Sequence, residues 1–269
     1  MKDLNIVPLQ HGDDSEPLIF IHALTGTILP YKHLIECLSC TRSIYGIEAV
    51  GLDGNMLPFE HVGSIAAHYA DAIQERFSNN RLILIGWSFG GLVAAELAAL
   101  LMPKMQLRLA LLDVQRLNNE RKNRLLSKDE ILLEFAYTLL GNVDRAAHSN
   151  LNNLASLPEK RKFSFVLDML LTTKRTSSPE LLQNMYRVFC AHLHAHDRYI
   201  PIPISNVKAL FIKAQRQPFD NQDASLGWSN IFSSKLEIVT APGDHYSLLN
   251  QHALTTAKYL NTWIDKIDS

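Results

Sequence analysis

A short apolar run, a glycine-flanked serine and a helix-forming segment follow one another within residues 82–94, and no other stretch constrains the chain more. The run Leu82–Ile85 consists of large aliphatic residues, as expected of a strand that is covered on both faces. It leads into Gly86-Trp87-Ser88-Phe89-Gly90, and a segment rich in Ala and Leu follows. In such a turn the glycines allow strand and helix to approach closely, and the serine hydroxyl is raised on a strained backbone. We therefore interpret Ser88 as the candidate nucleophile.

Elements of the same two kinds alternate along much of the remaining chain. Candidate strands lie at 18–21, 43–50, 107–112, 207–212 and 236–239, and helical patterns lie at 31–38, 64–77 and 253–263. Strands that alternate with helices predict a mainly parallel sheet with helices on its faces. With 269 residues, the chain is long enough for one sizeable core, so we expect residues 1–269 to form one α/β domain.

The alternation stops at about 119–200, where three helices are expected in succession. Ser127 and Glu130 have the spacing of a capping box, and Pro158 and Ser178-Pro179 are typical of two further helix starts. An insertion of this kind between two strands of a sheet can serve as a lid over a reaction chamber. The alternative is ordinary helical packing without a gating role.

Two further residues follow strands that end at the same edge as Ser88. Asp113 comes directly after the strand at 107–112, and His245 lies in a loop after the strand at 236–239. A carboxylate there can orient an imidazole, although Asp113 could instead cap a turn. The order Ser, Asp, His along the chain is that of the α/β-hydrolase fold. We therefore predict a catalytic triad of Ser88, Asp113 and His245.

Other candidate sites carry less weight. His192, His194 and His196 fall on one expected helix, but two histidines four residues apart need a further ligand, so no metal site is predicted. These histidines suit a wet helix end or a chamber lining. Cys37, Cys40 and Cys190 are too few for a disulfide framework and are interpreted as buried small apolar residues in a reducing compartment.

Composition excludes several classes of function. The formal net charge is -1, with 47% hydrophobic and 20% charged residues, so no nucleic-acid partner is expected. The chain begins without the apolar run of a signal peptide, and no later segment reaches the length of a membrane span. We therefore expect a cytoplasmic protein with no membrane partner.

With these residues in place, the chain resembles the thioesterase domains that end nonribosomal peptide and polyketide assembly lines, within the α/β-hydrolase superfamily. The resemblance covers nearly the whole chain. It rests on Val7-Pro8-Leu9, Phe20-Ile21-His22-Ala23-Leu24-Thr25-Gly26, Ile44-Tyr45-Gly46-Ile47-Glu48-Ala49, Gly86-Trp87-Ser88-Phe89-Gly90-Gly91, Leu111-Leu112-Asp113, Gly227-Trp228 and Gly243-Asp244-His245-Tyr246.

The resemblance implies a mechanism and a partner. Ser88 would attack the thioester of an acyl chain held on the phosphopantetheine arm of an acyl or peptidyl carrier protein, and hydrolysis or macrocyclisation would release the chain. The backbone amides of Leu24 and Phe89 would form the oxyanion hole. No cofactor of the enzyme's own is implied. Ala23 stands where the family usually has proline, and the useful amide belongs to the next residue.

Three other interpretations remain open. A stand-alone editing thioesterase, which clears aberrant acyl groups from carriers, tends to carry its acid after the next strand, where Asp220 or Asp223 would serve; the position of Asp113 favours the product-releasing kind. A generic carboxylesterase would need no carrier, and a binding module would need no nucleophilic serine. The chain shows a methionine start and no carrier domain, which suits either a free-standing enzyme or an excised terminal domain.

Overall fold

The computed structural model describes residues 6–77, 81–116, 126–140, 151, 153–172, 178–217 and 223–266. The described strands form one sheet in the order β1-β3-β2-β4-β5-β6-β7. Their bounds are β1 Ile6–Gln10, β2 Asp13–Ile21, β3 Arg42–Ile47, β4 Arg81–Trp87, β5 Gln106–Leu112, β6 Lys208–Ala214 and β7 Leu236–Ala241. All neighbouring strands pair in parallel except β1, which runs antiparallel to β3 at the edge. The predicted parallel α/β sheet is confirmed.

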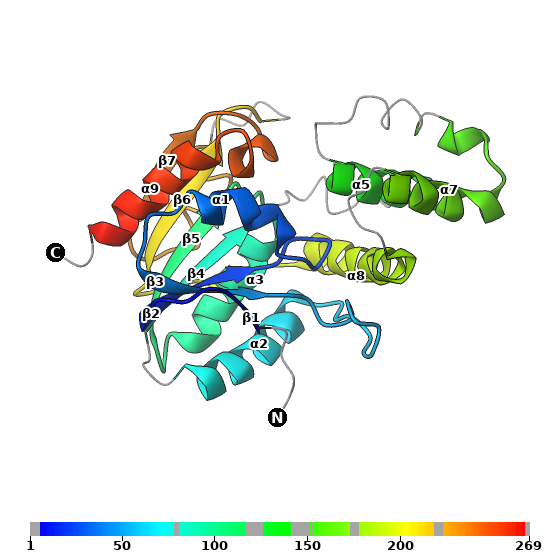
Figure 1. Ribbon diagram of the computed structural model, residues 1–269. Helices are drawn as coiled ribbons and strands as arrows, with labels where there is room; N and C mark the ends of the chain where they lie inside the picture. Colours follow the sequence, from blue (N-terminus) through cyan, green and yellow to red (C-terminus); the bar gives the residue numbers. More distant parts are fainter. Residues whose placement is uncertain are drawn as a thin grey trace.

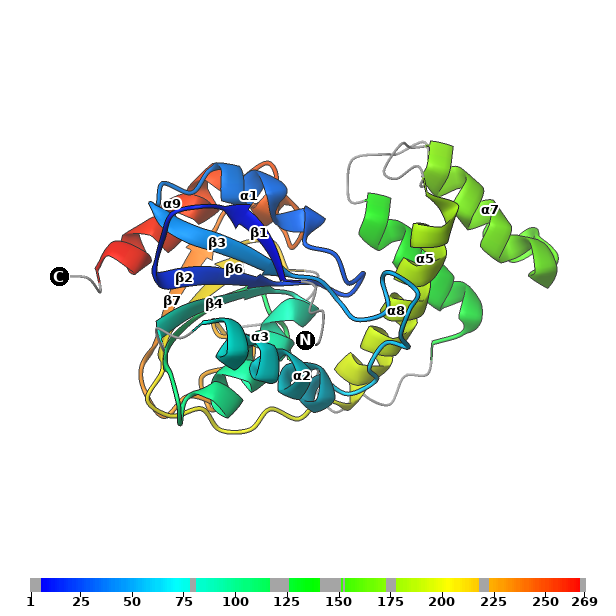
Figure 2. The same cartoon turned by 60° about the horizontal axis from the view of Figure 1, so that its bottom comes forward.

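Helices cover both faces of this sheet because its central strands present apolar side chains on both sides. Ile83 and Ile85 face α1 (Lys32–Glu36) and α9 (Ala253–Asp265), whereas Leu82 and Leu84 face α2 (Val62–Arg76) and α3 (Phe89–Leu101). Figures 1 and 2 show the two layers of helices on opposite sides of the sheet. This alternation explains why β4 has the near-continuous apolar sequence typical of a doubly covered strand.

Two element starts differ from expectation. The segment around Pro8 forms β1, an edge strand whose register shifts between Pro8 and Gln10, and an edge position tolerates a residue that lacks a backbone donor. Helix α2 begins at Val62 with His61 at its N-cap, two residues before Ser64. The helix therefore begins two residues earlier than the pattern at 64–77 predicts, and Ser64 lies inside it rather than at its N-cap.

The helical insertion comprises α5 (Lys128–Leu140), α7 (Glu159–Thr172) and α8 (Pro179–Arg198), with the short 3-10 helix η2 (Leu154–Ser156) between the first two. The predicted capping box is present, because Ser127 and Glu130 exchange hydrogen bonds. The predicted helix start at Ser178 is also present, and the Ser178 hydroxyl caps it by accepting a hydrogen bond from the amide of Leu181. The helices share a core that also includes Ala49 and Leu52, and Figures 1 and 2 show the helices to one side of the sheet. Helix α8 reaches back to contact both α2 and α3.

Candidate functional site

The carboxyl ends of β4, β5 and β6 bring the first site residues to one edge. Trp87 pairs with Leu112 across β4 and β5, so the residues that follow, Ser88 and Asp113, lie at adjacent strand tips. The amide of Ser88 donates to the Leu112 carbonyl at 3.2 Å, and that of Asp113 donates to the Ile212 carbonyl at 2.7 Å. The sheet ladder therefore continues one residue past each strand and fixes both tips.

Close packing around the turn explains its glycines. A Cβ on Gly86 would lie 2.3 Å from the carbonyl oxygen of Gly90, and one on Gly90 would lie 2.4 Å from that of Ile21. Both clashes involve backbone atoms, which cannot move aside cheaply. Ser88 has φ 55° and ψ -130°, a conformation that non-glycine residues rarely adopt. The local sequence thus holds the serine on a strained backbone where strand and helix nearly touch.

Asp113 is joined to His245 directly. The Asp113 side chain is almost fully buried, and its Oδ2 atom lies 2.8 Å from Nδ1 of His245. Its Oδ1 atom accepts hydrogen bonds from the amide of Ala214 at 2.8 Å and from Nε2 of Gln217 at 2.7 Å. Burial opposes ionisation, but the bonds from His245, Ala214 and Gln217 outweigh it and hold the pKa of Asp113 below its usual value. Asp113 is therefore suited to remain a carboxylate that orients the imidazole.

Trp87 holds the loop that carries His245. Its ring stacks on the imidazole with centroids 4.7 Å apart, and its Nε1 atom donates to the His245 carbonyl at 3.0 Å. Within 81–116 and 223–266, which the structure describes, the Ser88 hydroxyl makes no hydrogen bond to Nε2 of His245. Such bonds are often long before substrate binds, and the imidazole already lies against the residue next to Ser88.

Leu24 and Phe89 place two amides near this edge. Phe89 is the first residue of α3, so its amide has no partner within the helix. Leu24 follows β2 in a turn closed by the hydrogen bond from the Gly26 amide to the Ala23 carbonyl at 3.0 Å. Among the described residues, no hydrogen bond occupies either the Leu24 or the Phe89 amide. Both are therefore available as donors.

Two buried histidines lie against these residues. His22 and His192 stack with centroids 4.9 Å apart, and His192 stacks on Phe89 at 4.7 Å. Nε2 of His22 lies 2.7 Å from the Tyr69 hydroxyl, and Nδ1 lies 2.9 Å from the Ala23 carbonyl. Burial lowers the pKa of His22 to about 4 and, with the neighbouring His22, lowers that of His192 well below its ordinary value. Both rings are therefore neutral at pH 7.

The remaining sequence candidates lie elsewhere. Asp223 uses its carboxylate to accept bonds from Ser225 and from the amide of Gly227, which makes it a turn cap. Asp220 lies outside the described residues. His194 is exposed, whereas His192 is buried rather than at a wet helix end.

Potential metal ligands, cysteines and apolar helices were the other features that the sequence raised. No group of three metal-ligating side chains occurs among those residues. The three cysteines are free. Each is only partly buried, whereas the sequence predicted full burial. None of the described helices combines the length and apolar character that crossing a membrane requires.

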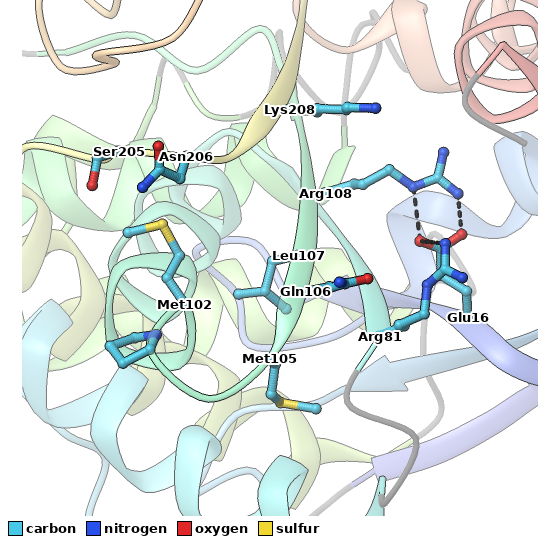
Figure 3. Close-up of a pocket in the computed structure, with 11 residues that line it drawn as sticks. Glu16, Arg81, Met102, Met105, Gln106, Leu107, Arg108, Ser205, Asn206 and Lys208 are labelled. Carbon is cyan, nitrogen blue, oxygen red and sulfur yellow. Dashed lines mark hydrogen bonds and ion pairs between the residues drawn. The ribbon is translucent and has the colours of Figure 1, made fainter.

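A cavity of about 630 Å³ lies at the opposite edge of the sheet. Arg81, Gln106 and Lys208, the first residues of β4, β5 and β6, contribute to its wall. Figure 3 shows Arg108 directed at Glu16, and the guanidinium donates to that carboxylate through two nitrogens. In parallel sheets the chemistry lies at the carboxyl ends of the strands, so this cavity is separate from the candidate active site.

The sheet, the elbow serine and the helical insertion define a protein of the α/β-hydrolase class. Within that class, the family model for the thioesterase domain matches residues 16–264, and the chain belongs to this family. The predicted resemblance is thereby confirmed at the level of the family.

Curated relatives include both large synthetases and smaller proteins. Malpibaldin synthetase of Mortierella alpina is 34% identical over 93 residues, which are 35% of this chain and 2% of the synthetase. Thioesterase frbD of Dothideomycetidae sp. is 35% identical over 92 residues, or 34% of each protein. Probable thioesterase gloN of Glarea lozoyensis is 22% identical over 257 residues, 87% of this chain and 84% of gloN. The chain thus spans a small part of the first two relatives.

Solved structures show the same fold. The four-domain nonribosomal peptide synthetase AB3403 matches 98% of this chain with 20% of its own length, at a TM-score of 0.84 and 22% identity. The Vlm2 thioesterase domain matches 96% of each chain at a TM-score of 0.70 and 20% identity. At these identities the likeness concerns the fold alone.

Proposed function

We propose that this protein is a serine thioesterase that releases an acyl, peptidyl or polyketide chain from the phosphopantetheine arm of a carrier protein. The observation that carries the proposal is the 2.8 Å contact between Asp113 and Nδ1 of His245 at the strand edge where Ser88 is raised on a strained turn. A carboxylate, an imidazole and a strained serine from three separate elements are what nucleophilic acyl transfer requires.

In the proposed first half-reaction, the Ser88 Oγ attacks the thioester carbonyl while Nε2 of His245 takes the hydroxyl proton. Asp113 accepts the hydrogen bond from Nδ1–H and stabilises the imidazolium that forms. The amides of Leu24 and Phe89 bind the developing oxyanion, and each such donor contributes about 3 kcal/mol to transition-state stabilisation. The C–S bond then breaks, and the leaving thiolate takes the proton back from His245.

In the second half-reaction, water or a hydroxyl or amine of the acyl chain attacks the Ser88 ester. His245 removes the proton from that nucleophile and returns it to Oγ as the C–O bond breaks. Water gives a free acid, whereas an internal nucleophile gives a lactone or a lactam. We include in the proposal that the helical insertion acts as a lid, a role supported by the contact of α8 with α2 and α3.

The test compares one acyl group presented in two ways. A carrier protein loaded with the acyl thioester is offered to the enzyme beside the same acyl group as a methyl ester, and mass spectrometry identifies both the released product and any acyl-enzyme. We expect acylation of Ser88 from the carrier and none in Ser88→Ala. Equal rates on carrier and simple ester would favour a carboxylesterase, and preference for short, aberrant acyl groups would favour an editing enzyme. Failure of Ser88 to react with a fluorophosphonate would favour the interpretation of the protein as a binding module without catalytic activity.

A further inference from the structure

The buried face of α8 is the unusual part of the site, because a ring from the helical insertion touches both parts of the proposed oxyanion hole. His192 is 1% exposed. Its ring stacks on that of Phe89 at 4.7 Å, with planes 19° apart, and on that of His22 at 4.9 Å, with planes 9° apart. The Phe89 and His22 rings also lie 6.3 Å apart, so the three rings form a cluster. Phe89 carries one proposed donor amide, and His22 precedes the turn that carries the other.

The hydrogen bonds of the two histidines settle their tautomers. Nδ1 of His192 lies 3.0 Å from the carbonyl of Leu24, and Nδ1 of His22 lies 2.9 Å from that of Ala23. A carbonyl oxygen only accepts, so each neutral ring carries its hydrogen on Nδ1. Nε2 of His22 is then free to accept from the Tyr69 hydroxyl at 2.7 Å. Each histidine therefore donates to the backbone of the same turn.

These two bonds hold the peptide units on both sides of Leu24. The Ala23 carbonyl belongs to the same peptide unit as the Leu24 amide, so His22 fixes the plane in which that N–H points. The Leu24 carbonyl belongs to the next unit, which His192 fixes. Because both peptide planes are held, the Leu24 N–H points in one direction. The stack of His192 on Phe89 in turn restricts the distance between the Leu24 amide and the Phe89 amide.

We propose that His192 is a positioning residue for the oxyanion hole, acting from the helical insertion through the carbonyl of Leu24. This inference rests on the proposed function, and it makes docking of α8 a condition for efficient acyl transfer. Stabilisation of an oxyanion depends on donors placed before the reaction, so a small misplacement of the Leu24 amide should lower kcat more than it changes substrate binding.

Two variants separate the role of the Nδ1–H donor of His192 from that of its ring, and a third variant is the control. His192→Phe keeps an aromatic ring for the stack and removes Nδ1–H, whereas His192→Asn keeps a donor of similar reach and removes the ring. His194→Phe is the matched control, because it makes the same change at an exposed position of the same helix. For each protein, kcat and KM are measured on one carrier-bound acyl thioester. The affinity of an alkylboronic acid, which forms a tetrahedral adduct with Ser88, is measured in parallel.

We expect His192→Phe to lower kcat by about tenfold or more, with KM nearly unchanged and boronate affinity lowered by a similar factor. His192→Asn should retain most of kcat, and His194→Phe should match the wild type. An unchanged kcat in His192→Phe, or equal losses in the Phe and Asn variants, would overturn the inference while leaving the proposed function intact. A wild-type protein that does not turn over the thioester would overturn both.

Discussion

Nε1 of Trp87 donates a hydrogen bond of 3.0 Å to the carbonyl of His245, while the indole ring stacks on the imidazole at 4.7 Å. Trp87, the residue before the proposed nucleophile, thus contacts both the backbone carbonyl and the imidazole ring of His245, the proposed base. Only this side chain links the elbow to the loop after β7 in that way among the contacts of the described residues. One buried indole therefore links the turn that carries the proposed nucleophile to the proposed base.

Trp87→Phe should keep the stack and remove the hydrogen bond. We expect the rate of Ser88 labelling by a fluorophosphonate to fall several-fold, because the His245 loop loses its anchor, and the free energy of unfolding to fall by about 1 kcal/mol. Trp263→Phe, in the core on α9, is the control for loss of indole area. Equal slowing of labelling in both variants would show that the Trp87 hydrogen bond has no specific role.

Asp113→Asn tests which carboxylate orients His245. The asparagine can still accept from Ala214 and Gln217, but its amide opposes Nδ1–H and favours the wrong tautomer. We expect acylation from a thioester to slow by roughly 10³ to 10⁴ with the fold intact, as in other triads. Asp223→Asn should leave this rate unchanged, since Asp223 caps a turn. A loss confined to the Asp223 variant, measured by single-turnover kinetics, would contradict the assignment.

The sequence predicted those parts of the site that follow from local pattern and sheet topology. Ser88 stands between glycines at a strand end, and the parallel arrangement brings Asp113 to the next strand tip without further information. His245 was predicted from its position after the final strand. Each of these inferences needs only the alternation of strands and helices, so the sequence carries enough information for them.

The other features of the site and the fold depend on tertiary contacts that local sequence patterns do not contain. The pairing of His192 with Leu24 spans 168 residues, and the helical pattern around His192 indicates only which histidines share a face. The strand at Pro8 is absent from the predicted strands, because the tolerance of proline in a strand depends on the edge position that the sheet order gives to β1. The role of Gln217 as a donor to Asp113 likewise follows from the end of β6 and from no local motif.

Ser88→Gly tests the backbone strain at the elbow. A glycine adopts φ 55° without the steric cost that a Cβ imposes, while Ser88→Ala removes the hydroxyl and keeps that cost. We expect the glycine variant to be more stable than the alanine variant by about 1 kcal/mol, although glycine also gains entropy in the unfolded chain. Urea unfolding of the two inactive proteins measures the difference. A more stable alanine variant would argue against strain at this position.

The depressed pKa of His22 predicts how stability varies with pH. Unfolded histidine takes up a proton below about pH 6.5, whereas buried His22 stays neutral until about pH 4. Protonation therefore favours the unfolded chain, and stability present above pH 6.5 is lost as the pH falls towards 4, by up to about 1.4 kcal/mol per pH unit. His22→Asn keeps a hydrogen-bond donor but does not titrate, so the free energy of unfolding, measured with urea, should fall less steeply with falling pH. An equally steep fall in the variant would mean that another group causes the pH dependence. The lowered pKa of Asp113 affects stability at lower pH, because its contribution is lost only as the pH falls below the ordinary value of 3.8.

Glu16→Gln separates stability from catalysis. The Glu16 carboxylate is 3% exposed and accepts bonds from Arg108, which is 4% exposed, with Arg42 also within 3.1 Å. Removing its charge breaks the buried ion pair between Glu16 and Arg108, a change that typically costs about 3–5 kcal/mol. The cluster lies at the edge of the sheet opposite Ser88, so we expect a clear fall in melting temperature with the Ser88 labelling rate unchanged below the transition. Slower labelling in folded protein would mean that the two edges are coupled through the sheet.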